Sequence, residues 1–330
     1  MKVNVVSDGD GLYGWQLRWE RWRTQPRARI GLLVAMGLGV MMFLAIIAGI
    51  YESREPALLQ VEPSPSLAPG VLLVRTTARV ARSLYDKPGG YLANDLTPPG
   101  VWLDDMPHWE LGVLAEVRTM VHALHEQWGL SRADYVEDDD LSHADTDFAV
   151  DPQSWWFPRP EREFQDGVGA LHAYADRLAL RPPQAIFLAR DAALRQYLEE
   201  VDDDLGRMSA HLNAAVPQVG AEGDRIVARP TTSWWRIDDV FYEARGRCWA
   251  LVPLLQALDS EYATTLQQRH ADLSMRAAIH ELEATQQTLW SPMVLNGSGF
   301  GLFANHSLTL ANYIDRAHLD LSDVVSQLGP

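Results

Sequence analysis

The sequence predicts an all-α protein in which an N-terminal transmembrane helix is followed by a bundle of long antiparallel helices. Three observations predict this fold class. One long apolar run without charged residues lies near the N-terminus, and the apolar residues of the remaining chain recur at helical spacing. The period-two alternation of β-branched residues that is typical of strands is nearly absent. A chain of 330 residues with 47% hydrophobic residues is a folded protein of one or two domains.

The apolar run from Ile30 to Tyr51 predicts a membrane-spanning helix. It contains no Asp, Glu, Lys, Arg or His, and at about 1.5 Å per residue it matches a hydrocarbon core of roughly 30 Å. Several arginines crowd residues 1–29, whereas Glu52 and Glu55 follow the run. The positive-inside rule therefore places residues 1–29 in the cytoplasm. A cleaved signal peptide is the competing interpretation, but its apolar region is usually only about 7 to 15 residues long.

Charge is distributed unevenly along the chain. Residues 1–29 hold six basic and three acidic side chains, net +3, and the remainder is net −19, which together give the total of −16. The acidic remainder argues against nucleic acid as a partner and against attraction to an anionic lipid surface. All basic residues except Lys2 and Lys87 are arginine, which excludes a P-loop and a Ser-x-x-Lys dyad. With a bacterial cell assumed from this arginine usage, we expect a single-pass inner-membrane protein with a periplasmic C-terminal domain.

Residues 52–70 predict a linker, and residues 71–330 predict the periplasmic helical domain. The linker is rich in proline and poor in large apolar residues, a composition typical of an extended, semi-stiff tether. We therefore expect a tether between the membrane and the body.

Three helices are predicted in the first half of the body. The first runs from Val74 to Leu84 and ends at Pro88, the second begins near Pro107, and the third begins at Pro160 and ends before Pro182. Their predicted buried stripes are Val74, Ala78, Ala81 and Leu84; Val113, Val117, Met120, Leu124 and Trp128; and Phe164, Val168, Leu171, Ala175 and Leu178. The acidic stretch 134–151 lacks the register of a calcium loop, so we expect a solvated loop there.

Two further helices show the alternating three and four spacing of a coiled-coil seam. The predicted stripes are Phe187, Leu194, Leu198, Val201, Leu205, Met208 and Leu212, and Phe241, Ala244, Cys248, Leu251, Leu255, Leu258 and Tyr262. Pro253 predicts a kink in the later helix. The helix from Ile237 either continues past Asp272 or breaks near it, and the sequence leaves both possibilities open. A last helix is predicted over 307–328.

Two segments of the body resemble a known protein family. The segment from Leu84 to Asp95, Leu-Tyr-Asp-Lys-Pro-Gly-Gly-Tyr-Leu-Ala-Asn-Asp, followed by Pro-Pro-Gly-Val-Trp-Leu-Asp-Asp-Met-Pro-His-Trp-Glu over 98–110, resembles the signature of a family of uncharacterised single-pass inner-membrane proteins of Gram-negative proteobacteria. The segment from Trp235 to Ala250 is similar to a second block of that family. The resemblance implies a membrane anchor and no particular activity, so it assigns no catalytic residues.

Three motifs that suggest chemistry are better explained by structure. His122 and His125 share a helix face but lack a third metal ligand, so we interpret them as solvated or core-edge histidines. Cys248 lies on an apolar stripe, where a thiol is buried and inert. The Gly-rich segment 296–301 fits neither a nucleophile elbow nor a phosphate cradle, which favours a loop. We predict no catalytic residues, no metal site and no cofactor.

One carboxylate and tryptophan cluster has the composition of a carbohydrate site. Its members are Trp102, Asp104, Asp105, Trp109 and Glu110. The structural alternative, which we favour, is that the aspartates cap the helix beginning near Pro107 while the tryptophans fill a corner between helices.

Aromatic residues in predicted loops are candidates for an interaction surface, since tryptophan is frequent at interfaces. They are Trp155, Trp156, Trp234, Trp235, Phe300 and Phe303. For the tryptophans we favour the alternative role of filling the ends of a helical bundle. The repeated Ser-Trp-Trp at 154–156 and 233–235 is compatible with an old duplication.

Together these observations favour a non-enzymatic, membrane-anchored scaffold or interaction protein of the bacterial cell envelope. Its expected partners are the inner-membrane bilayer and either another envelope protein or a second copy of the chain. A cell-wall glycan-binding or glycan-processing protein is the first alternative, and it would use the carboxylate and tryptophan cluster. A carrier of a lipid or small ligand is the second.

Overall fold

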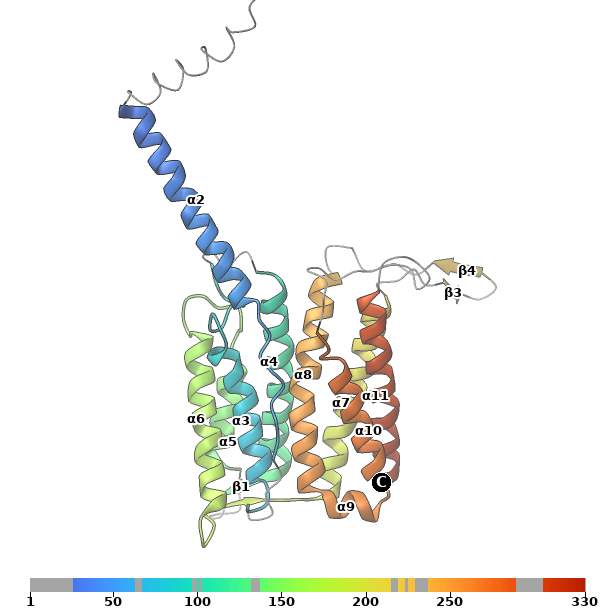
Figure 1. Cartoon of the computed structure of the whole chain (residues 1–330). Helices are drawn as coiled ribbons and strands as arrows, with labels where there is room; N and C mark the ends of the chain where they lie inside the picture. Colours follow the sequence, from blue (N-terminus) through green and yellow to red (C-terminus); the bar gives the residue numbers. More distant parts are fainter. Residues whose placement is uncertain are drawn as a thin grey trace, which may run out of the picture. The chain divides into compact units, whose positions relative to one another are not determined.

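The computed structural model describes residues 26–62, 67–96, 100, 103–131, 137–214, 219–222, 225–228, 237–288 and 305–329 (Figure 1). The chain divides into two compact units, Met1–Tyr51 and Glu52–Pro330. We refer to the second unit as the body. The predicted all-α bundle is confirmed, because the described part of the body is almost entirely helical.

The predicted apolar helix is confirmed as α2, Pro26–Glu52. Within its segment Ile30–Glu52, the most apolar 18-residue stretch has a mean hydropathy of 2.7 and no buried residues. Leu, Met, Phe and Ile side chains are exposed on all its faces, as expected of a helix that faces lipid rather than a protein core. By length and composition α2 is able to cross a membrane.

The first half of the body contains the helices α3 (Val71–Asp86), α4 (Asp105–Ala123), α5 (Asp139–Phe148) and α6 (Pro160–Ala179). The predicted stripes of α3, α4 and α6 are buried, which confirms these three helices. The last turn of α4 passes into a π-helical turn, Leu124–Trp128. In the packing, α6 contacts both α3 and α5, and α4 contacts α3.

The prediction of a solvated loop over 134–151 is wrong, because residues 139–148 form α5. Leu141, Ala144 and Phe148 of α5 are buried, while its acidic side chains occupy the other faces. Asp138 caps this helix and is itself fully buried. Its carboxylate accepts a hydrogen bond of 2.8 Å from the Arg177 guanidinium. The buried carboxylate is stable because a charged partner compensates its lost hydration.

The second half of the body contains α7 (Asp191–Asn213), α8 (Ile237–Glu261), α9 (Ala263–Gln268), α10 (Asp272–Ala284) and α11 (His306–Leu328). The predicted α7 stripe is buried from Leu194 onward, and the α8 stripe is buried throughout. Pro253 lies inside α8. The helix from Ile237 does not continue past Asp272, because α8 ends at Glu261. A second break separates α9 from α10, where His270 adopts a positive φ of 59°.

Two short antiparallel strand pairs complete the described structure. β1 (Gly129–Ser131) pairs with β2 (Ala185–Phe187), with Leu130 opposite Ile186. β3 (Val219–Glu222) pairs with β4 (Arg225–Ala228). The spacing predicted Phe187 as the first residue of the α7 stripe. This prediction is wrong, because Phe187 is a strand residue. Its ring stacks on Trp128 at 6.0 Å between centroids.

A close helix contact between α4 and α8 joins the two halves of the body. α4 and α8 run in the same direction, with Gly112 of α4 against Glu243 and Gly246 of α8 against Trp109. A Cβ atom on Gly112 or on Gly246 would overlap a backbone carbonyl of the other helix. Glycine at both positions permits this close approach.

Residues 55–61 of the segment predicted as a tether contact the helices of the body. Glu55 pairs with Arg245 of α8 at 2.8 Å, and the Pro56 carbonyl accepts a hydrogen bond of 3.1 Å from Trp249. The Gln60 carbonyl accepts another from Arg79 of α3. Leu58, Leu59 and Val61 are half-buried against the core. These contacts hold residues 55–61 along the helices.

Candidate functional site

Most candidate residues lie at one end of the body, where α3 ends and α4, α6 and α8 begin (Figure 1). Gly89, just after α3, is so close to Glu52 that a Cβ atom there would lie 2.7 Å from the Glu52 Cγ. Asn94, a few residues later, donates a hydrogen bond of 3.1 Å to the carbonyl of Ser154, before α6. We call this part of the molecule the proximal end, because Glu52 directly follows the apolar helix in the chain.

Glu110 and Trp109 serve the fold and are closed to a ligand. Both side chains are fully buried. The Glu110 carboxylate pairs with Lys87 at 2.6 Å and accepts hydrogen bonds from the backbone amides of Leu92 and Ala93. Trp109 packs against Trp249 with ring centroids 5.1 Å apart. The tryptophan therefore fills a helix contact, as the structural alternative predicts, and Glu110 anchors the loop after α3.

Asp104 and Asp105 begin α4, but Asp104 forms no capping hydrogen bond through its side chain. The prediction that the aspartates cap α4 is therefore wrong for Asp104. Asp105 is half-buried, and this burial together with the nearby Asp238 carboxylate raises its pKa to about 6 despite a hydrogen bond from Tyr242. The structure thus separates the predicted carbohydrate cluster into exposed, half-buried and buried members. Trp102 lies outside the described residues.

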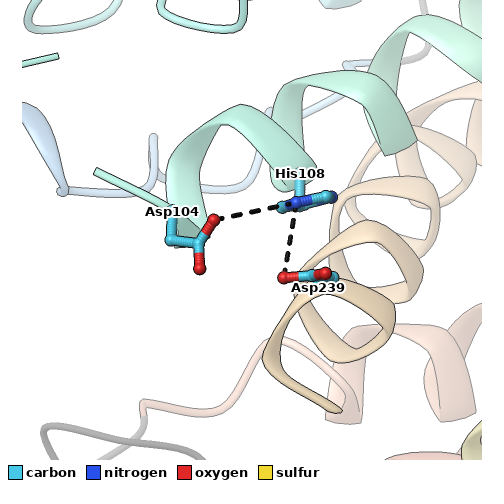
Figure 2. A group of neighbouring side chains, drawn as sticks. All are labelled: Asp104, His108 and Asp239. Carbon is cyan, nitrogen blue, oxygen red and sulfur yellow. Dashed lines mark ion pairs between the residues drawn. The ribbon is translucent and has the colours of Figure 1, made fainter. Parts of the chain in front are cut away.

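A different set, Asp104, His108 and Asp239, gathers at the proximal end (Figure 2). His108 Nε2 lies 3.9 Å from Asp104 Oδ1 and 3.4 Å from Asp239 Oδ1. Asp104 and His108 are one helical turn apart on α4, and Asp239 comes from the first turn of α8. One nitrogen and two carboxylate ligands could hold a divalent cation. A protonated His108 would satisfy the same two carboxylates as an ion pair.

Sequence reasoning did not single out His108 or assign Asp239 to a site. Spacing along α4 pairs Asp104 with His108, but no local pattern indicates that α8 runs parallel to α4. The third side chain is therefore contributed by tertiary packing alone.

The two helical histidines face α5 and do not form a closed ligand set. His122 is largely exposed, with Nδ1 3.2 Å from Asp145 Oδ2, and His125 is mostly buried, with Nδ1 3.5 Å from the same oxygen. Glu126 and Glu137 also lie within 3.6 Å of His125 ring nitrogens. This arrangement agrees with the interpretation of a solvated and a core-edge histidine.

Cys248 is fully buried in the α8 stripe. Burial raises the pKa of its thiol to about 12, so the thiolate that a nucleophile requires is strongly disfavoured near neutral pH. The interpretation of Cys248 as a packing residue is confirmed.

The aromatic residues of the loop between α5 and α6 are strongly exposed. Trp155, Trp156 and Phe157 retain 59%, 72% and 81% of their accessible surface. The two tryptophan rings contact each other edge to face, with centroids 5.4 Å apart. We call these three residues the aromatic tip. They are an exposed surface, not the filling of a bundle end. The other candidates, Trp234, Trp235, Phe300 and Phe303, and the segment 296–301 lie outside the described residues.

A groove of about 460 Å³ lies between α8, α10 and α11. Phe241, Arg245, Leu310 and Tyr313 contribute to its walls. Its volume suits a small ligand, and it is the feature most relevant to a carrier function.

Comparison with known proteins identifies a family and no function. The family DUF2333, described as uncharacterised proteins conserved in bacteria, matches residues 25–328. No curated protein and no solved structure matches the chain. The matched range includes both α2 and the body.

Proposed function

The chain belongs to this family of bacterial proteins, and we propose that it is a non-enzymatic scaffold of the cell envelope. In this proposal α2 anchors the protein in the inner membrane, residues 1–29 face the cytoplasm, and the body lies in the periplasm. The body holds another envelope protein or a second copy of the chain.

Two properties support this membrane topology. α2 is long and apolar enough to span a bilayer, and arginines precede it while acidic residues follow it. Retention of positive charge on the cytoplasmic side gives the proposed orientation. The strongly acidic body then lies on the periplasmic side of the membrane.

The single observation that carries the scaffold proposal is the packing of residues 52–61 on the body. Contacts of Glu55 with Arg245 and of Pro56 with Trp249 attach the chain to α8 directly after the apolar helix. Residues 52–61 therefore do not form a flexible linker. A short connection of this kind suits a protein that places a partner relative to the membrane.

Two residues with side chains capable of chemistry, Glu110 and Cys248, serve the fold. Glu110 is neutralised by Lys87 in the core, and Cys248 is buried in α8. By contrast, Leu273 of α10 and Leu319 of α11 expose 73% and 65% of their surface. Single exposed leucines are common on protein surfaces, so these two positions serve as probes for a protein contact.

In-cell photocrosslinking of the full-length protein tests the proposal. A photoreactive amino acid is placed at Leu273 or Leu319, and the same residue at Leu38 in α2 is the lipid-facing control. We expect adducts to one defined envelope protein or to this chain, confirmed by a reciprocal crosslink from the partner, and lipid adducts at Leu38. Absence of protein adducts at both positions, together with turnover of an envelope substrate by the purified protein, contradicts the scaffold proposal.

A further inference from the structure

The aromatic tip is exposed but rigidly supported. Arg118 of α4 donates hydrogen bonds of 2.6 Å to the carbonyls of Phe148 and Val150, which hold the start of the loop. Asn94 binds the Ser154 carbonyl directly before the tip, and α6 begins at Pro160 directly after it. The tip is therefore presented in one place, so that little conformational entropy is lost when it binds.

The tip and the start of the body share the proximal end. Asn94, which contacts Ser154, lies in the same short loop as Gly89, which contacts Glu52. Glu52 is both the last residue of α2 and the first residue of the body. Residues 55–61 are packed along the helices and so belong to the body from its start.

The chemistry of the tip matches the headgroup layer of a bilayer. Tryptophan combines a large apolar ring with a polar N–H group and concentrates at membrane–water interfaces. Leu96, in the same loop as Asn94, is 59% exposed, and Arg159 beside the tip is exposed as well. An apolar tip with a neighbouring guanidinium can bury its rings among acyl chains while the cation meets a phosphate.

We propose that Trp155, Trp156 and Phe157 insert into the interface of the bilayer that α2 spans, so that the body has a second membrane contact. The inference rests on the proposed membrane anchoring by α2 and adds the partner of the aromatic tip. It does not conflict with the net negative charge of the body, because insertion of aromatic rings depends on the hydrophobic effect and not on attraction to anionic lipid. Insertion of the rings should accordingly persist at high salt.

The test uses full-length protein in nanodiscs of phosphatidylethanolamine and phosphatidylglycerol. An environment-sensitive fluorophore is attached to the cysteine of the variant W156C. The parent protein, whose Cys248 is buried, measures the background labelling. The matched control is L180C, because Leu180 is exposed and follows the opposite end of α6. A fraction of the lipids carries a nitroxide on the headgroup.

We expect several-fold stronger nitroxide quenching and a bluer emission for the label on W156C than for the label on L180C, at both low and high salt. Equal, weak quenching at the two positions would overturn the inference. Efficient crosslinking of a photoreactive residue at Trp156 to a protein in cells would also overturn it, because the tip would then belong to a protein interface.

Failure of the anchor is distinguishable from failure of the tip. If α2 does not span the bilayer, the protein does not co-elute with the nanodiscs. If only the inference about the tip is wrong, the protein co-elutes and the label on W156C remains unquenched. A W155S/W156S/F157S variant provides a second test, with a photoreactive residue placed next to the tip. Co-elution with the nanodiscs and loss of lipid adducts at that residue would confirm the assignment.

Discussion

Lys87 Nζ lies 2.6 Å from Glu110 Oε1, and both side chains are completely buried. The pair joins the loop after α3 to α4, and Glu110 also binds the amides of Leu92 and Ala93 in that loop. The same loop carries Gly89 and Asn94, which contact Glu52 and the base of the aromatic tip. This buried ion pair therefore organises the proximal end of the body.

We predict that Glu110→Ala destabilises the body by about 3–5 kcal/mol, because it leaves the Lys87 ammonium buried without a counter-charge. Chemical denaturation followed by circular dichroism measures the loss. Asp86→Ala is the control, since the Arg82–Asp86 pair is exposed and should change stability little. Similar stabilities for Glu110→Ala and the parent would show that the pair does not support the fold.

Stability should depend on pH through Glu116. Burial raises the pKa of its carboxyl from 4.5 to about 7, and the Arg247 guanidinium opposes only part of that rise. The folded chain then binds this proton more tightly than the unfolded chain, so the contribution of Glu116 to stability decreases as pH rises from about 4.5 to about 7.

Glu116→Gln should flatten the pH dependence of the free energy of unfolding in this range. Arg247 keeps Asp204 and Glu243 within 3.5 Å in that variant, so its charge stays paired. Glu199→Gln on the exposed face of α7 is the control and should leave the slope unchanged. Parallel pH profiles for Glu116→Gln and the parent would contradict the prediction.

The contact between α4 and α8 should not tolerate a methyl group. We expect Gly112→Ala and Gly246→Ala each to destabilise the body by about 1–3 kcal/mol or more, because the added atom overlaps backbone of the facing helix. Gly169→Ala on α6 is a matched control, since no atom lies within 4 Å of its added Cβ. That control should stabilise the helix by about 0.5–1 kcal/mol. Thermal unfolding of the three variants measures the contrast.

Membrane insertion should depend on the centre of α2. Leu38→Arg places a charge in the apolar helix at a cost of about 3 kcal/mol, and we expect a smaller membrane fraction after carbonate extraction. Leu38→Ala should behave like the parent. In the proposed orientation, alkaline phosphatase fused to the C-terminus is active in cells. An inactive fusion, together with an N-terminus that is cleaved by protease added to spheroplasts, would show the reverse topology.

Local patterns predicted most helices because a buried helix face repeats every three or four residues whatever it packs against. The stripes of α3, α4, α6 and α8 are buried as predicted. α5 was missed because its acidic residues dominate the composition, although Leu141, Ala144 and Phe148 form a short apolar stripe. Phe187 was placed in a helix because a single apolar residue fits a helix or a strand pattern equally well.

The candidate site was less predictable from the chain. Composition suggested that Asp104, Asp105 and Glu110 act together. In the structure, the buried Glu110 pairs with Lys87, whereas Asp104 lies beside His108. Glu110 follows His108 closely in sequence and yet points into the core. Which way each side chain points depends on the helices packed around α4, and these are distant in sequence.

The sequence by itself determined the apolar helix and the helical class of the body, because length, charge and periodicity act within each segment. Only the tertiary structure decided that residues 52–61 lie along the helices and that the aromatic tip and Glu52 share the proximal end. Those relationships arise from contacts such as Glu55 with Arg245 and Asn94 with Ser154. Such contacts join residues far apart in the chain, and their free energy depends on burial that no local pattern contains.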